Sequence, residues 1–129
     1  MERVNSLECF DINEKPILHV KVSDPKNENS AEIDVLVDTG FSGWLLLNYE
    51  IYTKLNYMEI PITRKYRSIL GNIEVYMAKA SISINRLNID AFIESSPYVE
   101  MNLLGREILK KLNICFYRMN KICIYSDVV

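Results

Sequence analysis

An apolar run that ends abruptly in an acid, a hydroxyl and a glycine constrains this chain more than any other feature. Residues 33–37 read Ile-Asp-Val-Leu-Val, and Asp38, Thr39 and Gly40 follow directly. The β-branched, apolar run predicts a strand, and the Asp-Thr-Gly triplet predicts a tight turn at its end. Because a buried carboxylate needs a partner or a chemical role, Asp38 is the first candidate for a functional residue.

A second informative segment lies further along the chain, where residues 102–112 read Asn-Leu-Leu-Gly-Arg-Glu-Ile-Leu-Lys-Lys-Leu. Its apolar side chains recur at helical spacing, which predicts a helix over 105–112. A shorter helix is expected over 49–55. These are the two helical segments that the sequence predicts.

The rest of the chain predicts many short strands. Apolar or alternating runs indicate strands over 16–23, 31–37, 44–47, 58–62, 77–85 and 91–93, and a last hairpin from 114–117 and 122–125. Residues 86–90 are expected to turn. Gly71 and Asn72 tolerate positive φ, so residues 66–76 predict another hairpin that turns at Leu70-Gly71-Asn72.

This pattern of elements indicates the fold class. Many short strands, one helix near the end and no internal βαβ unit favour an all-β fold, a mostly antiparallel closed barrel with one short C-terminal helix. The length of 129 residues predicts a single domain over 1–129.

Composition excludes several classes of function. The net charge is −2 and the pI is about 5.4, and no block of lysine and arginine stands out, so we expect no nucleic-acid partner. The apolar runs are too short for a membrane span, so no membrane partner is expected. The first residues lack the apolar core of a signal peptide, which predicts a cytoplasmic location.

The cysteines and the single histidine do not form a metal site or a nucleophilic pair. Cys9, Cys115 and Cys123 lack metal-ligand spacing, and His19 stands in an apolar alternation that predicts a strand. We therefore expect neither a metal nor a cofactor. Cys115 and Cys123 lie among apolar and aromatic residues, where reduced, buried thiols are the default; a disulfide between them is the alternative.

The Asp-Thr-Gly and Leu-Leu-Gly-Arg segments, in this order and spacing, resemble the retropepsin-like aspartic proteases of clan AA, in particular a microbial Asp-Thr-Gly-Phe type. The resemblance extends from about residue 16 to residue 125 and suggests the half-length kind, in which two chains build one active site. It implies that Asp38, Thr39 and Gly40 form the catalytic turn. It also implies that the Thr39 hydroxyl holds two such turns together across the axis.

The same resemblance assigns roles to two further segments. It implies that Leu103, Leu104, Gly105 and Arg106 pack beneath the catalytic turn and support it. It also implies that the hairpin around residue 71 is a flap over the substrate. Substrate would then contact the following residues: Gly40, Phe41, Ile69, Leu70, Gly71 and Asn72. An ordinary surface hairpin is the alternative to a flap.

This sequence departs from the retroviral pattern beside the catalytic turn. Phe41 stands where those enzymes usually carry Ala or Ser, and Ser42 and Gly43 replace the acids that follow. Arg106 matches an arginine that pairs with one of those acids in the family. Its partner here must therefore be something else.

The chemistry implied by the resemblance needs two carboxylates, one acting as base and one as acid. The chain has a single Asp-Thr-Gly, so a homodimer would have to supply the pair. The leading hypothesis is a homodimeric aspartic endopeptidase that hydrolyses extended, apolar peptide segments with water activated between two Asp38 carboxylates. The alternatives are a catalytically silent dimer that binds peptides, and a barrel in which Asp38 anchors a small molecule.

Overall fold

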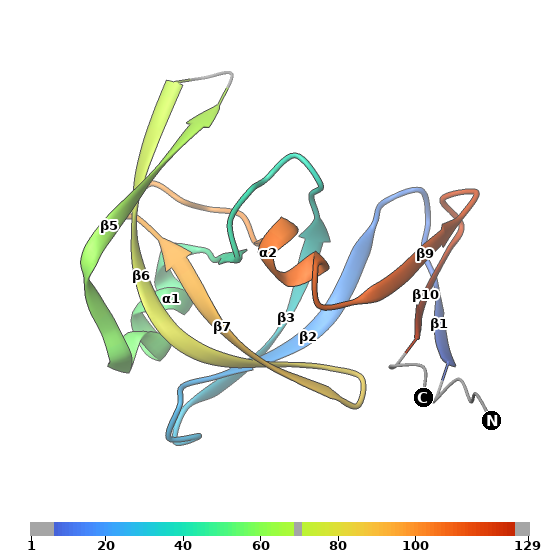
Figure 1. Ribbon diagram of the computed structural model, residues 1–129, viewed down its shortest axis with the longest axis horizontal. Coiled ribbons are helices and arrows are strands. Elements are labelled where there is room, and N and C mark those ends of the chain that lie inside the picture. The colour runs from blue at the N-terminus through green and yellow to red at the C-terminus, as the bar shows by residue number, and fades with distance from the viewer. Residues whose placement is uncertain (1–6, 69–70, 126–129) are drawn as a thin grey trace.

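The computed structural model describes residues 7–68 and 71–125 (Figure 1). This part of the chain contains ten strands, two short α-helices and one 3-10 turn. In chain order they are β1 Leu7–Asp11, β2 Ile17–Ser23, β3 Ser30–Val37, β4 Leu45–Leu46, α1 Tyr49–Leu55, η1 Asn56–Met58, β5 Glu59–Ser68, β6 Gly71–Ile84, β7 Leu87–Ser95, β8 Leu103–Leu104, α2 Arg106–Leu109, β9 Asn113–Tyr117 and β10 Lys121–Tyr125. The predicted all-β, mostly antiparallel class with a short C-terminal helix is confirmed.

Seven strands form the main sheet in the order β2-β3-β8-β4-β7-β6-β5. Strand β6 is long enough, at 14 residues, to pair with β5 and β7 and also with β2. The pairing of β6 with β2 brings the hydrogen-bonded order back to its first strand, so six strands enclose the core and β5 extends outside them. No helix in the described residues is long and apolar enough to cross a membrane.

The core is built from the inward-facing positions of these strands. Leu18, Val20 and Val22 alternate with exposed residues on β2, and β3 repeats the pattern. Strand β3 therefore reaches Asp38 with one face packed in the core, as a half-buried antiparallel strand should. Tyr52 and Leu55 of α1 are buried in the same core.

A separate three-stranded sheet, in the order β1-β10-β9, lies beside the barrel (Figure 1). Strand β1 was not predicted, since the first expected strand begins at residue 16. A disulfide joins Cys9 of β1 to Cys123 of β10, so the expectation of a reduced Cys123 and its alternative, a Cys115–Cys123 bond, are both wrong. Cys115 is free but exposed rather than buried.

Several predicted boundaries also differ from the structure. The segment predicted to turn at residues 86–90 is mostly strand, because β7 begins at Leu87 and pairs with β6 from that residue. The strand expected over 44–47 contains only Leu45–Leu46, and the helix expected over 105–112 is limited to Arg106–Leu109. The helix over Tyr49–Leu55 is present as predicted.

Candidate active site

The Asp-Thr-Gly turn follows β3 directly and is fixed by main-chain hydrogen bonds. The Gly40 N–H donates to Oδ1 of Asp38 at 2.9 Å, and the Phe41 N–H donates to the Asp38 carbonyl at 3.1 Å. Asp38 is half-buried, whereas Thr39 and Gly40 are exposed. The turn thus orients one carboxylate oxygen from its own backbone and leaves the carboxyl group accessible.

The Leu-Leu-Gly-Arg segment lies next to this turn. Strand β8 is inserted between β3 and β4, where Leu104 pairs with Val37 in parallel and with Leu45 in antiparallel register. The Asp38 N–H donates to the Leu104 carbonyl at 3.0 Å. The structure therefore brings Leu103 and Leu104 next to the Asp38 turn.

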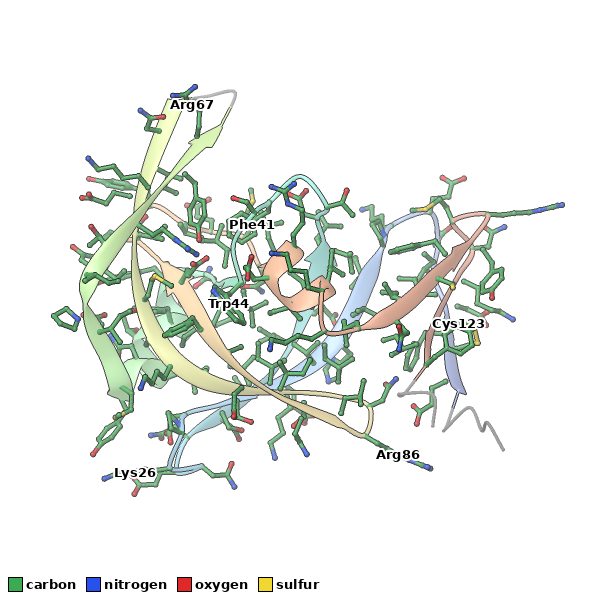
Figure 2. The ribbon with its side chains drawn as sticks, viewed as in Figure 1. Lys26, Phe41, Trp44, Arg67, Arg86 and Cys123 are labelled. Carbon is green, nitrogen blue, oxygen red and sulfur yellow. A yellow bond between two sulfur atoms is a disulfide. The ribbon has the colours of Figure 1, made fainter. Side chains whose placement is uncertain are left out.

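Gly105 and the start of α2 hold the other side of the loop. The Gly105 N–H donates to the Trp44 carbonyl at 2.7 Å, and the Arg106 N–H donates to the Phe41 carbonyl at 2.8 Å. A Cβ at Gly105 would collide with the main-chain oxygen of Gly43. The close approach of these two backbone segments requires glycine at position 105. Figure 2 shows Phe41 and Trp44 beside the helix that follows this contact.

The Arg106 side chain has no acidic partner in the described residues, unlike the matching arginine of the family that the sequence resembles. It is exposed, and within residues 7–68 and 71–125 its guanidinium makes neither a hydrogen bond nor an ion pair. The arginine nearest a buried acid is instead Arg64, whose Nη1 lies 3.9 Å from Oε1 of Glu94.

Glu94 is the residue beside the site that sequence reasoning missed. It is 0 % exposed; Oε2 accepts from the Trp44 N–H at 3.3 Å, and Oε1 accepts from the Tyr66 hydroxyl. Burial is the main cause that raises the pKa of Glu94. The alternation on β7 places Ala91 and Ile93 inward, which predicts an exposed Glu94. No local pattern indicates that the loop after Gly40 and strand β5 cover the face on which Glu94 lies.

The predicted flap is the hairpin of β5 and β6, which projects from the barrel at the upper left of Figure 1. Its strands pair from Thr63 with Tyr76 to Ser68 with Gly71. Gly71 has φ +125°, as expected of a glycine beside a turn. Asn72, in contrast, lies in β6 opposite Arg67, so it is a strand residue rather than a turn residue. The predicted substrate contacts Ile69 and Leu70 lie outside the described residues.

His19 is a strand residue, as predicted, and lies on the outer face of β2. Its Nδ1 is 3.0 Å from Asp34 and its Nε2 is 3.4 Å from Glu32, both on the paired strand β3. These hydrogen bonds raise the pKa of His19. The histidine is exposed and belongs to a surface cluster, not to the Asp38 turn.

A hollow of about 700 Å³ lies on the outer side of β2, β6 and β7, and its lining does not include Asp38, Thr39 or Gly40. Trp44 and Phe92 form its aromatic wall, with their rings 5.5 Å apart. Among the described residues, no group of three His, Cys, Asp or Glu side chains is placed to hold a metal ion.

Comparison with known proteins identifies the fold through structure alone. No protein-family model matches the sequence, and no curated protein is similar to it at a significant level. A retropepsin-like aspartic protease from Rickettsia conorii matches with a TM-score of 0.64 and 16% identity, over 100% of this chain and 96% of that one.

A second solved structure, the EIAV protease in complex with the inhibitor HBY-793, matches with a TM-score of 0.56 and 23% identity. The match covers 78% of this chain and 90% of that one. Together with the turn after β3 and the insertion of β8 beneath it, these likenesses show that the chain has the retropepsin-like fold.

Proposed function

We propose that this protein is an aspartic endopeptidase whose active site is completed by a second copy of the chain. The observation that carries the proposal is the accessible Asp38 carboxyl group, whose Oδ1 accepts from the Gly40 N–H at 2.9 Å in a retropepsin-like fold. The two neighbours of known structure are described as proteases, which supports the same chemistry here.

One copy of the chain has a single acid at this turn, and carboxylate-based peptide hydrolysis uses two. The other acid close by, Glu94, is buried behind the loop and accepts hydrogen bonds from Tyr66 and Trp44. It is not available to substrate. A two-fold dimer that brings both Asp38 side chains to the axis would supply the missing group.

The terminal sheet offers a surface for such a dimer. Strand β10 is paired on both sides, whereas the outer edges of β1 and β9 have no strand partner among the described residues. Phe10 of β1 and Phe116 of β9 lie in one row across the sheet and are each 37 % exposed. Open edges that carry apolar side chains favour association with another chain.

In the proposed reaction, water lies between the two Asp38 carboxyl groups, which share one proton. The ionised carboxyl group takes a proton from the water as the water oxygen attacks the peptide carbonyl carbon. The protonated carboxyl group donates its proton to the developing oxyanion. The carboxyl group that took the proton from water then donates it to the amide nitrogen, and the other carboxylate takes a proton back from a hydroxyl of the intermediate. The C–N bond breaks, the amine and the new carboxyl end are released, and the pair again holds one proton. Thr39 would hold the two turns together.

Substrate would bind as an extended strand beneath the β5–β6 hairpin, through main-chain hydrogen bonds and alternating side-chain pockets. Gly40 leaves room for the substrate backbone because it has no side chain. Phe41 is partly buried against Tyr66, so the surface next to the turn is apolar. This favours substrates with apolar side chains.

The test is cleavage of an unstructured apolar peptide by wild type and by Asp38→Asn, with and without a metal chelator. Asparagine matches the shape of aspartate but cannot act as a general acid or base. The proposal expects cleavage by wild type, unaffected by the chelator, and loss of cleavage in the variant. Binding of the peptide without cleavage by wild type would favour the silent peptide-binding dimer. Wild-type rates in Asp38→Asn would move catalysis elsewhere.

A further inference from the structure

The loop that follows Asp38 meets the first strand of the β5–β6 hairpin at one cluster of residues around a buried acid. Its members are Phe41 and Gly43 of the loop, Tyr66 of β5 and Glu94 of β7. We call this set the Glu94 cluster. None of these residues lies in the Asp-Thr-Gly triplet, and Tyr66, Gly43 and Glu94 were not among the predicted site residues.

Glu94 connects three parts of the chain through its two carboxyl oxygens and its backbone. Oε1 accepts from the Tyr66 hydroxyl and Oε2 from the Trp44 N–H at 3.3 Å. Its main-chain oxygen accepts from the Leu47 N–H at 2.9 Å. A buried carboxylate with satisfied acceptors is far more specific in geometry than an apolar side chain, because breaking either bond leaves a desolvated polar atom.

Tyr66 brings the hairpin into this cluster. Its ring packs edge-on against Phe41 with centroids 5.0 Å apart, and its hydroxyl donates to Glu94. Tyr66 lies two residues before the end of β5, opposite Ile73 of β6. It is therefore on the part of the hairpin that projects beyond the barrel.

A positively charged side chain, Arg64, lies near the Glu94 carboxyl group. Arg64, on the same face of β5, places Nη1 3.9 Å from Glu94 Oε1 and 3.5 Å from the Tyr66 hydroxyl, and its side chain is 48% exposed. Glu107 of α2 also acts on Glu94, and it is paired with Lys110 at 2.7 Å. The cluster thus has one partly exposed cation facing its buried acid.

Gly43 shows how closely the loop approaches this group. A Cβ at Gly43 would collide with the Tyr66 hydroxyl, with Oε2 of Glu94 and with the Phe41 ring. A loop side chain at position 43 would push β5 away from the loop. The retroviral pattern carries an acid at this position, whereas this chain has glycine.

We propose that Glu94 is a positioning residue that anchors the β5–β6 hairpin to the catalytic loop through Tyr66. A two-stranded hairpin is only marginally stable by itself, so its position depends on contacts with the rest of the chain. The Glu94 cluster supplies such a contact on the β5 side. This inference rests on the proposed peptidase function, because it assigns the hairpin a role in substrate binding.

Loss of the contact between Tyr66 and Glu94 should weaken substrate binding. If substrate binds only when the hairpin is held over the turn, loss of the anchor lowers the competent fraction and raises the apparent dissociation constant by the same factor. We expect Tyr66→Phe to raise KM about fivefold and to leave kcat within about twofold. The Asp38 turn itself is unchanged in this variant.

Tyr76→Phe is the matched control. Tyr76 is on the other strand of the same hairpin, is 42% exposed, and makes no side-chain hydrogen bond in the described part of the chain. Removal of its hydroxyl should leave KM and kcat at wild-type values. Glu94→Gln provides a second test of the anchor, since its amide oxygen can serve only one of the two donors.

Hydrogen exchange of the hairpin separates failure of this inference from failure of the proposed function, since it needs no activity. We expect Tyr66→Phe to speed exchange in residues 63–67 and 72–75 at least about tenfold, with β2 and β3 unchanged, and Tyr76→Phe to have no such effect. Faster hairpin exchange together with a raised KM supports the anchor. Unchanged hairpin exchange, or equal KM values in Tyr66→Phe and Tyr76→Phe, would overturn it, even if stability falls.

Discussion

The Asp38 N–H donates to the Leu104 carbonyl at 3.0 Å, which joins the two sequence motifs at one point of the structure. Leu104 is fully buried and lies between β3 and β4, whereas the Asp38 carboxyl group stays accessible. Leu103 and Leu104 thus form a strand beside the turn, and Gly105 then leads into α2. This strand orients the backbone that carries the candidate catalytic acid.

Gly105→Ala tests this support. A Cβ at position 105 would collide with backbone atoms of Gly43, and backbone cannot move aside as a flexible side chain can. We expect a loss of about 1–3 kcal/mol in the free energy of unfolding, measured by denaturant titration, together with reduced peptidase activity. Glu100→Ala, at an exposed loop position, is the control and should be neutral. Equal stability of Gly105→Ala and wild type would contradict this account of the close contact.

The rate of hydrolysis should depend on pH in a bell shape. Two carboxyl groups about 3 Å apart cannot both ionise freely, so they share a proton and titrate as a pair. In the proposed mechanism only the singly protonated pair is active, and carboxylic acids titrate on the acid side of neutrality. We therefore expect the maximum in the acid range, measured from about pH 3 to pH 8 with the oligomeric state followed throughout. A flat profile in a stable dimer would exclude the shared proton.

Glu94 should make stability depend on pH. Burial raises its pKa above the ordinary value of 4.5, opposed by the Tyr66 hydroxyl, the Trp44 N–H and Arg64, while Glu107 adds to the rise. The folded state holds the Glu94 proton more tightly than the unfolded state does. The contribution of Glu94 protonation to stability is therefore fully present below pH 4.5 and is lost as pH rises through the folded pKa.

The measurement is the unfolding free energy of wild type minus that of Glu94→Gln, from pH 4 to pH 8 in steps. This difference should fall as pH rises, by about 1.4 kcal/mol for each unit of pKa shift. Glu100→Gln should run parallel to wild type, because its side chain is exposed. A Glu94→Gln curve that also runs parallel to wild type would contradict the raised pKa.

The disulfide should stabilise the fold by joining strands from opposite ends of the chain. Cys9 and Cys123 are separated by 114 residues, and closing so long a loop lowers the entropy of the unfolded chain. We expect Cys9→Ser to cost about 4 kcal/mol in denaturant titration under non-reducing conditions. Cys115→Ser, which alters the free and exposed cysteine, should cost much less. Equal stability of Cys9→Ser and wild type would contradict a structural bond.

The sequence predicted the parts of the fold that local patterns determine. Alternating runs identified β2 and β3, and helical spacing identified α2, because in each case one face is buried and the other is not. Gly71 was expected at positive φ and has it. The turn at Asp38 was predicted because Asp and Gly at the end of an apolar strand favour a tight turn.

The parts that the sequence did not predict depend on contacts between distant segments. Glu94 is buried on a face that alternation assigns to solvent, because the loop after Gly40 and strand β5 cover it. Strand β1 and the Cys9–Cys123 bond depend on pairing between the two ends of the chain. Neither pairing has a local signature, since cysteine spacing alone does not fix connectivity.

Subunit mixing tests the central claim, that two copies of Asp38 form one active site, most directly. Wild type and Asp38→Asn are unfolded and refolded together in different ratios, and native mass measurement of tagged subunits checks that they assort at random. If both Asp38 side chains are needed, activity follows the square of the wild-type fraction, and an equal mixture retains about one quarter of the activity. An equal mixture with about one half of the activity, and a linear dependence on the wild-type fraction, would show that each chain acts alone and would contradict the account.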